Sequence, residues 1–531
     1  MARFAAIGYR DPAGAMRHVQ ALTDGVSRRA SIQRQLLPVL LGWFAEGADP
    51  DEGLLAFRKL SDTLGSTHWY LRLLRDSAEA ASRLAQVLSS SRYLADAIGR
   101  SPESVRWLAE SDSLAPRGVR RLAAEADALL GRAQEVDAAT VALRALRRRE
   151  LARTGVAEVL GALGPVSAAR AISDAADVVL AGGLRIAEHD ARAERGVARG
   201  DEPARLLIVA MGRLGGQELG YGSDADVMFV YEAVGGAPDK QANDYALTVA
   251  KNLRRILSAV GPEPGLPVDA DLRPEGRNGP LVRSFESYVE YYDRWSSPWE
   301  AQALLRARAL SGTLSVVAAG GPEEGAVAAL LSDGGTAGTG ELDLGPGAEG
   351  GVSLGARFTA LIDPLRYPEG GPDAAVLREV RRIKARVESE RLPRGADPAR
   401  HLKLGRGGVS DVEWTVQLLQ LQHAFEVPGL RTTGTVAALK AARDADLLAD
   451  DDAEVLLDAW RLASRLRSAI VLWSGRTTGS GVDMLPHDSH ALTGLARLLG
   501  DVGTGPELEE LYLRLARRAR GVMERVFYGA E

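Results

Sequence analysis

The chain has 531 residues, 46% of them hydrophobic and 26% charged, and its formal net charge at pH 7 is −6. This length exceeds what one hydrophobic core covers, and it predicts roughly two to four domains of an ordinary soluble protein. The chain contains no cysteine, which excludes disulfides and thiolate metal sites and fits a cytoplasmic location. The negative charge argues against nucleic acid as a partner, and no apolar run approaches the roughly 18 residues of a membrane span.

Residues 1–115 show the apolar periodicity of helices. Asp49 is a typical N-cap, because Pro50 occupies the first helical position and two acids follow it, where they suit the positive end of the helix dipole. Pro38 starts or kinks the helix before it. We therefore expect a helical leading region.

Helical periodicity continues from residue 116 to about residue 198. This segment contains a basic cluster of Arg147, Arg148, Arg149 and Arg153. A short charge run is more often a solvated helix face than a binding patch, so we expect these side chains to face water. A structural or nucleotide-facing role stays open.

The stretch from Leu206 to Glu232 reads LLIVAMGRLGGQELGYGSDADVMFVYE. Two apolar runs, which we expect to be buried strands, flank a glycine-rich turn. Asp224 and Asp226 stand two apart at the start of the second run, so both carboxylates project from one face of the strand. Carboxylates bind Mg²⁺, and a turn of glycines and Ser223 lets phosphates approach the backbone. The pattern predicts a nucleotidyl-transfer site, although strand ends also carry solvated acids.

A third carboxylate follows a predicted helix at about 240–260. If residues 268–272 form a short strand beside the first two, Asp269 comes within reach of Asp224 and Asp226. Such a cluster can hold two metal ions about 3.5 to 4 Å apart, the arrangement that clamps the attacking and leaving oxygens of an in-line displacement.

Arg306 lies on a predicted helix that begins near Pro298. Its guanidinium can bind a triphosphate bidentately, or it can form an ion pair with Glu300 or another acid. Residues 318–352 are rich in glycine and acids and contain no aromatic residue, which predicts a flexible surface insertion.

The remainder of the chain, residues 353–531, has mostly helical periodicity and predicts a bundle. Within it, Lys384, Arg386 and Arg391 on one helix are candidates to face a nucleotide. Lys403 is the better candidate because it precedes a glycine turn that opens a helix, where a lysine can approach a phosphate. A solvated lysine would look the same in the sequence.

Several segments, in order along the chain, resemble successive motifs of the glutamine synthetase adenylyltransferase family. These segments are GRLGGQELGYGSDADVMFVYE, VDADLRPEGRNGPLV, PWEAQALLRARAL, IKARVESER and HLKLGRGGVSDVEWTVQLLQLQHA. The resemblance implies a mostly helical α+β fold, with a nucleotidyltransferase core similar to that of DNA polymerase β and helical bundles on both sides. We expect a helical leading or regulatory region at 1–115, a nucleotidyltransferase domain with its leading helices at 116–317, the flexible insertion at 318–352 and a C-terminal helical bundle at 353–531.

The resemblance also implies an activity, the transfer of AMP from ATP to a tyrosine hydroxyl of glutamine synthetase with release of pyrophosphate. Asp224, Asp226 and Asp269 would be the catalytic and Mg²⁺-binding residues. One Mg²⁺ would carry the ATP phosphates and the other would lower the pKa of the tyrosine. The expected nucleotide-binding residues are Gly212, Arg213, Gly216, Ser223, Arg306 and Lys403. Asp271 departs from the family pattern, which more often has arginine there.

Full-length members of this family contain two such halves, and only one GRLGG…SDAD set occurs here. The chain resembles a single half, and the overall similarity of its motifs favours the C-terminal, AMP-transferring half. A PII-type signal protein is the further partner that the resemblance implies. Three alternatives stay open: phosphorolytic removal of AMP from modified glutamine synthetase, nucleotidyl transfer to a small molecule, and a non-catalytic regulatory binding module.

Overall fold

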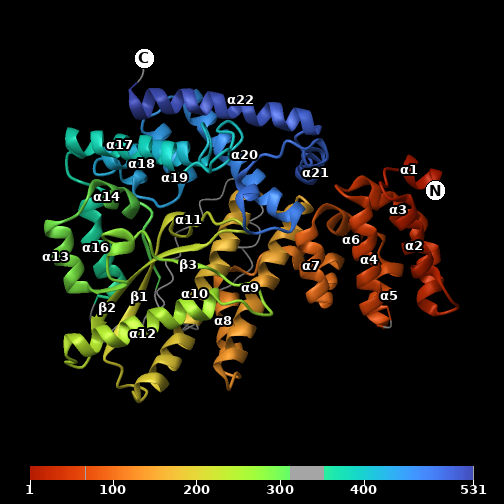
Figure 1. Cartoon of the computed structure of the whole chain (residues 1–531), viewed down its shortest axis with the longest axis horizontal. Helices are drawn as coiled ribbons and strands as arrows, with labels where there is room; N and C mark the ends of the chain where they lie inside the picture. The colour runs from red at the N-terminus through yellow and green to blue at the C-terminus, as the bar shows by residue number, and fades with distance from the viewer. Residues whose placement is uncertain (66, 311–351, 530–531) are drawn as a thin grey trace.

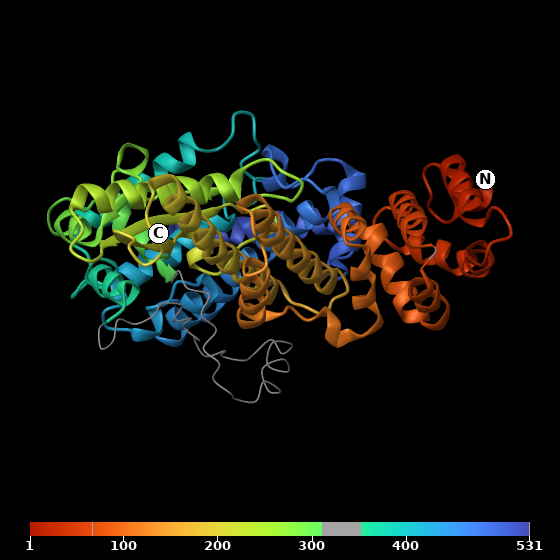
Figure 2. The same ribbon diagram turned by 90° about the horizontal axis from the view of Figure 1, so that it is seen from below.

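The computed structural model describes residues 1–65, 67–310 and 352–529. The predicted fold class, α+β and mostly helical, is confirmed: a small sheet lies among helices that precede and follow it (Figure 1). The molecule is elongated, with the N-terminal helices at the end remote from the sheet (Figures 1 and 2). Within these ranges, no helix is long and apolar enough to cross a membrane.

The leading region is helical, as predicted. Asp49 caps its helix as expected, since its carboxylate accepts a hydrogen bond from the Glu52 amide at 3.3 Å, and Pro38 lies inside the preceding helix. The helices are α1 (Ala2–Ala6), α2 (Pro12–Thr23), α3 (Arg28–Glu46), α4 (Pro50–Leu64), α5 (His68–Asp76), α6 (Ala78–Ser90) and α7 (Arg92–Arg100), followed by two 3₁₀ segments, η1 (Pro102–Ala109) and η2 (Ser111–Leu114).

Three longer helices lead into the sheet: α8 (Gly118–Leu130), α9 (Val136–Val159) and α10 (Pro165–Arg195). The expectation that the arginine cluster on α9 faces water is wrong for three of its four members. Arg147, Arg148 and Arg153 are buried, whereas Arg149 is half-buried and pairs with Glu125 at 2.7 Å. The cause is tertiary, because other segments supply acceptors for these guanidiniums, such as the Glu263 carboxylate for Arg148 and the Ser113 carbonyl oxygen for Arg153.

The buried arginines of α9 hold the loop that joins α12 (Asp239–Ser258) to the strand of the third acid. Arg144 donates to the carbonyl oxygens of Leu257 at 2.7 Å and Ala259 at 2.6 Å, and Arg148 forms an ion pair with Glu263 at 2.6 Å. Both residues are buried, so α9 fixes the path of the chain into the site. This is the structural alternative that the sequence left open.

The sheet contains β1 (Ala204–Ala210), β2 (Ala225–Ala233), β3 (Val268–Asp269), β4 (Val282–Ser284) and β5 (Arg308–Leu310). The strand order is β3-β2-β1-β5; β1 pairs antiparallel with both β2 and β5, and β3 and β4 pair parallel with β2. The predicted strands at 206–211 and 227–231 are therefore confirmed. The α12 helix also agrees with the prediction of a helix at about 240–260.

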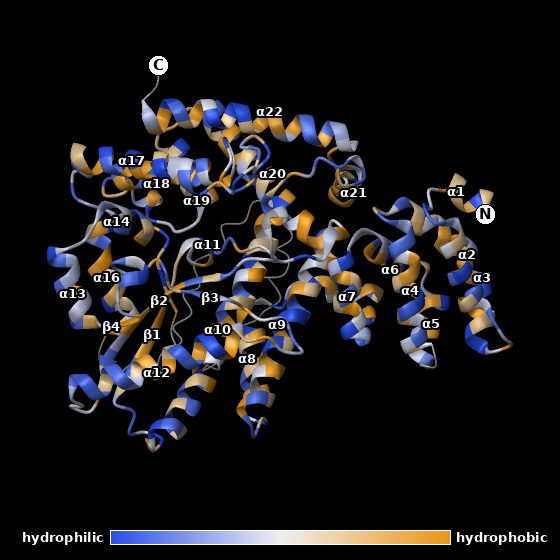
Figure 3. Cartoon of the chain, in the orientation of Figure 1, coloured by the Kyte–Doolittle hydropathy of each residue, from blue (hydrophilic) through white to orange (hydrophobic). Residues whose placement is uncertain are grey.

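Alternation along β1 places its side chains in two cores. Leu206 and Ile208 join the core shared with α10 and α12, whereas Leu207 and Val209 pack with Tyr288 of α13 (Phe285–Arg294) and with residues of α16 (Leu354–Arg366). Both central strands are strongly hydrophobic (Figure 3). Helices thus cover both faces and leave the strand ends to build a site.

The part of the chain after the sheet is mostly helical, as its periodicity predicts, and the helices from α17 (Ala374–Glu390) onward lie above the sheet in Figure 1, whereas α16 packs against it. The prediction of an insertion at 318–352 falls outside the described residues except for its last position. The remaining helices are α11 (Gly212–Gly215), α14 (Pro298–Leu304), α17 (Ala374–Glu390), α18 (Val409–His423), α19 (Thr435–Asp444), α20 (Asp450–Ser474), α21 (Ser489–Leu499) and α22 (Gly505–Met523), which ends in a π-helical turn.

Candidate active site

The three predicted acids come together at the start of β2. Asp226 lies opposite Asp269 in the parallel pairing of β2 with β3, and Asp224 immediately precedes β2. One carboxylate oxygen from each residue lies within 4.8 Å of the other two. The strand pairing that the sequence required is therefore present, and the geometry suits a shared cation.

The negative charges of this cluster act on one another. Burial, and then the carboxylate of Asp224, raise the pKa of Asp226 to about 7, while the Lys403 ammonium lowers it and Asp269 raises it. Like charges held this close favour a proton or a cation between them. A divalent metal ion would relieve the same repulsion.

Asp271, the position that departs from the family pattern, lies near enough to the cluster for its charge to raise the pKa of Asp226. Its side chain pairs with Arg277, and its backbone amide donates to the Asp269 carboxylate at 2.8 Å. The amide orients Asp269 in β3, so Asp271 serves the site through its backbone.

The glycine turn between β1 and β2 approaches the acids closely. Gly212 has a φ of +51°, and a Cβ added there would lie 2.4 Å from Oδ2 of Asp226. A Cβ on Gly216 would lie 2.4 Å from the guanidinium of Arg306. These two positions require glycine for space, and the first also for its backbone conformation.

Two further predicted nucleotide-binding residues lie in the same turn. Arg213 donates from Nε to the carbonyl oxygen of Glu218 at 2.7 Å, and its Nη1 is buried with no hydrogen-bond partner in the described part of the chain. The hydroxyl of Ser223 accepts a hydrogen bond from the Gly220 amide at 2.9 Å, which closes the turn next to Asp224.

Arg306 is 5% exposed and binds protein groups in this structure. Its Nε donates to the carbonyl oxygen of Gly212 at 3.1 Å, its Nη1 donates to the hydroxyl of Thr435 at 2.6 Å, and its Nη2 pairs with Glu218. This is the ion-pair alternative, with Glu218 as the acid in place of Glu300. Glu300 instead accepts a hydrogen bond from the hydroxyl of Tyr291 at 2.8 Å.

Sequence reasoning missed a second arginine that holds the turn. Arg308 forms an ion pair with Asp177 of α10 at 2.9 Å and donates to the carbonyl oxygen of Leu214 at 3.1 Å. It also missed Glu218 and Thr435, which join the turn to the start of α19. No local signal marks these partners, because they lie far apart along the chain.

The bundle side of the site is formed by α18 and the glycine turn before it. Lys403 is exposed in that turn and lies near enough to Asp226 to affect its pKa, which agrees with its predicted place. Lys384 does not face the acids of the site. It is 1% exposed, and its Nζ donates to Asp411 at 2.6 Å and pairs with Glu388 at 3.1 Å.

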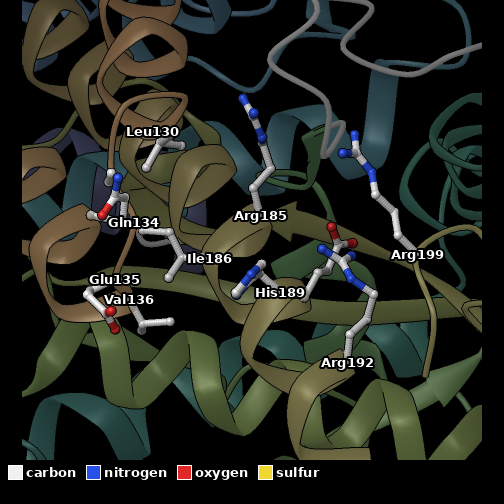
Figure 4. A pocket seen from close by; sticks show the side chains of 12 residues that line it. Leu130, Gln134, Glu135, Val136, Arg185, Ile186, His189, Arg192 and Arg199 are labelled. Atoms are coloured by element: carbon white, nitrogen blue, oxygen red, sulfur yellow. The ribbon is translucent and has the colours of Figure 1, made fainter. Parts of the chain in front are cut away.

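A cavity of about 410 Å³ lies elsewhere, between α8, α9 and α10 (Figure 4). Arg185 and Arg192 line it, and both are paired, with Asp127 at 2.5 Å and Glu202 at 3.0 Å. None of the residues that line it belongs to the acidic cluster or the glycine turn. It is therefore separate from the candidate active site.

Two protein-family models match this chain. Residues 81–320, which contain the acidic cluster, match the model described as glutamate-ammonia ligase adenylyltransferase. Residues 381–527 match the model described as PII-uridylyltransferase.

Curated relatives align with almost the whole chain. Proteins named bifunctional glutamine synthetase adenylyltransferase/adenylyl-removing enzyme from Streptomyces coelicolor and Leifsonia xyli are each 48% identical over 99% of this chain, and the one from Mycobacterium avium is 42% identical over 99%. The aligned part is 49%, 47% and 49% of these relatives, so the chain spans about half of their length. The chain belongs to the glutamine synthetase adenylyltransferase family.

Proposed function

We propose that the chain transfers AMP from ATP to a tyrosine hydroxyl of glutamine synthetase and releases pyrophosphate. The observation that carries this proposal is the cluster of Asp224, Asp226 and Asp269 beside a glycine turn. The names of the relatives support glutamine synthetase as the acceptor protein. The core would then be a nucleotidyltransferase domain similar to that of DNA polymerase β, within the four-part division expected from the sequence.

The three carboxylates would hold Mg²⁺, and the structure offers a test of fit. Their oxygens converge, their charges raise the pKa of Asp226, and Gly212 leaves the space in front of Asp226 that any side chain would fill. Bound Mg²⁺ would neutralise phosphate charge and lower the pKa of the attacking hydroxyl.

The protein groups around the acids would hold the triphosphate. The backbone at Gly212 has no side chain and lies against Asp226, so phosphate oxygens bound at the acids could approach the amides of the glycine turn. Arg213 offers its unpartnered Nη1, and Lys403 adds a cation from the bundle side. Ser223 and Gly216 would line the same turn. Arg306 would keep this turn in place through Gly212.

The transfer itself is an in-line displacement. The tyrosine oxygen forms a bond to the α-phosphorus as the bond to the pyrophosphate oxygen breaks. The residues of the turn hold the leaving pyrophosphate, and the rigid β2–β3 pairing keeps Asp226 and Asp269 at the reacting centre.

The match to a PII-uridylyltransferase model over residues 381–527 supports a PII-type signal protein as a second partner. This match lies in the bundle, on the side of the site that carries Lys403. A regulator bound to the bundle would act on the turn through Thr435, which donates to Glu218 at 2.6 Å. Binding of a PII protein that changes the transfer rate would support this part of the proposal.

A second candidate function is removal of AMP from modified glutamine synthetase by phosphate, with release of ADP. The relatives are named as bifunctional and the chain spans about half of their length, so either activity fits this half. The same acids would serve both reactions.

The experiment that separates the candidates runs two reactions in parallel. One contains Mg²⁺, α-labelled ATP and unmodified glutamine synthetase; the other contains Mg²⁺, phosphate and the AMP-modified synthetase. Label on the synthetase that disappears in the D224A/D226A variant supports transfer. ADP release in the second reaction alone would replace transfer by removal. Binding of Mg²⁺-ATP without either reaction would indicate a non-catalytic module.

A further inference from the structure

Glu413 is an acid at the site that the proposed chemistry does not use. It lies in the second turn of α18, its side chain is 19% exposed, and its Oε1 is buried. Within the described ranges this oxygen accepts no hydrogen bond. Nη2 of Arg306 lies 3.9 Å from this oxygen, beyond hydrogen-bond distance.

The neighbouring network does not need this carboxylate. Glu218 pairs with Nη2 of Arg306, and its oxygens also accept from the amide and the hydroxyl of Thr435 at 2.6 and 2.9 Å. Arg306 is thereby paired without Glu413. A buried acceptor without a hydrogen bond is unfavourable, because it has lost its water and gained no donor. Such a group in a site indicates a donor that arrives with a ligand.

The position of Glu413 relative to the acids suggests which ligand group it meets. Arg306, its neighbour, binds the carbonyl oxygen of Gly212 and lies against Gly216, so Glu413 borders the glycine turn from the bundle side. A carboxylate repels phosphates, which the acids and the turn would hold. The uncharged nucleoside half of ATP is the part that a carboxylate attracts.

We propose that Glu413 accepts a hydrogen bond from a donor on the nucleoside half of ATP, either a ribose hydroxyl or the exocyclic amine of the base. This inference rests on the proposed function and makes Glu413 a nucleotide-specificity residue of the same site. Acidic side chains bind ribose hydroxyls in this way in dinucleotide-binding folds. Hydrogen bonds that involve a charged group contribute enough for a tenfold to hundredfold change in affinity, on the order of 1.5–3 kcal/mol.

The test measures dissociation constants of nucleotides by calorimetry in the presence of Mg²⁺. The proteins are the wild type, E413A, E413Q and the control E426Q, which removes one exposed acid just beyond α18. The nucleotides are ATP, 2′-deoxy-ATP, 3′-deoxy-ATP and purine riboside triphosphate, which lacks the exocyclic amine.

E413A is expected to bind ATP tenfold to a hundredfold more weakly than the wild type, whereas E426Q stays within about twofold. One of the three analogues lacks the donor that Glu413 binds. The wild type and E413A should bind that analogue with the same dissociation constant. E413Q keeps the side-chain volume and a neutral acceptor, so it should show the same pattern with a smaller loss of ATP affinity. It replaces E413A in the test if that variant does not fold.

Two results would overturn the inference while the proposed function stands. One is unchanged ATP affinity in E413A. The other is an equal loss for every analogue, which would mean that Glu413 only supports Arg306. A wild type that binds no ATP would overturn both proposals, and a wild type that binds ATP but transfers no AMP would overturn the proposed function alone.

Discussion

Arg306 donates from Nε to the carbonyl oxygen of Gly212 at 3.1 Å, and so joins the chain after the sheet to the turn that approaches the acids. The same guanidinium pairs with Glu218 and donates to Thr435 of α19. One buried cation thus connects the glycine turn, the sheet domain and the bundle.

Replacement of Arg306 by methionine should destabilise the protein strongly. The change leaves Glu218 buried without its cation, and removal of one partner of a buried ion pair costs about 3–5 kcal/mol. We expect the melting temperature to fall by several degrees in calorimetry. R394M, which replaces an exposed arginine, is the control and should melt like the wild type. A melting temperature for R306M equal to that of R394M would show that this network is not a stabilising one.

Replacement of Gly212 by alanine should strongly reduce the rate of AMP transfer. The added methyl group would meet the Asp226 carboxylate, and the φ of +51° strains a residue with a side chain. G236A is the matched control, because Gly236 has a φ of +73° and open space around it. Initial rates of AMP transfer should fall at least a hundredfold in G212A and less than twofold in G236A. Equal rates in the two variants would argue against a close approach of the turn to Asp226.

Glu158 of α9 should make stability depend on pH. The Tyr221 hydroxyl donates to its carboxylate at 2.7 Å, and burial raises the pKa of Glu158 from 4.5 to about 7 although Tyr221 lowers it. The folded state therefore holds this proton more tightly than the unfolded chain. The free energy of unfolding should fall as the pH rises from about 4.5 to about 7, and this contribution is constant above that range.

The E158Q variant checks this prediction, because glutamine keeps the acceptor for Tyr221 and removes the charge. Relative to the wild type it should gain stability at pH 8, on the order of 2 kcal/mol, and much less at pH 5. The measurement compares the melting temperatures of the wild type and E158Q at pH 5 and pH 8. E426Q, which replaces an exposed glutamate, is the control. An equal effect of E158Q at pH 5 and pH 8 would contradict the pKa assignment.

Replacement of Lys403 by methionine should weaken ATP binding without unfolding the protein. Its side chain is exposed, so little packing is lost, and its ammonium is the bundle-side cation near Asp226. We expect the dissociation constant of Mg²⁺-ATP to rise about tenfold, as for loss of one charged contact. The control K440M removes an exposed lysine of α19 and should leave the dissociation constant of Mg²⁺-ATP unchanged. Equal affinities for K403M and K440M would exclude Lys403 from the nucleotide site.

The sequence predicted those parts of the fold that local patterns encode. Apolar runs marked β1 and β2, helical spacing marked α12, and the spacing of Asp224 and Asp226 placed both carboxylates on one face. The pairing that brings Asp269 to them does not follow from the sequence, which offers it only as a condition, and the structure meets this condition with the two residues of β3. The predicted features depend on side-chain periodicity and turn chemistry.

Partners that are distant along the chain could not be predicted. The solvated interpretation of the α9 cluster failed because the acceptors of Arg148 come from residues beyond α12 and from the end of α7. Arg306 pairs with an acid 88 positions away, and Thr435 reaches Glu218 across 217 positions. The sequence shows which residues carry charge, and only tertiary packing shows which of them meet.

The most direct test of the account is whether Asp224, Asp226 and Asp269 act as one metal site. Mn²⁺ prefers the same carboxylate ligands as Mg²⁺, and its free concentration can be followed by electron paramagnetic resonance during a titration. Four proteins are compared: the wild type, D226N, D269N and D293N, the last a control whose exposed side chain pairs with Arg294. We predict at least tenfold weaker Mn²⁺ binding in D226N and D269N, as expected when a metal loses a direct ligand, and a change within about twofold in D293N. Mn²⁺ affinity in D269N equal to that of the wild type would contradict the central claim.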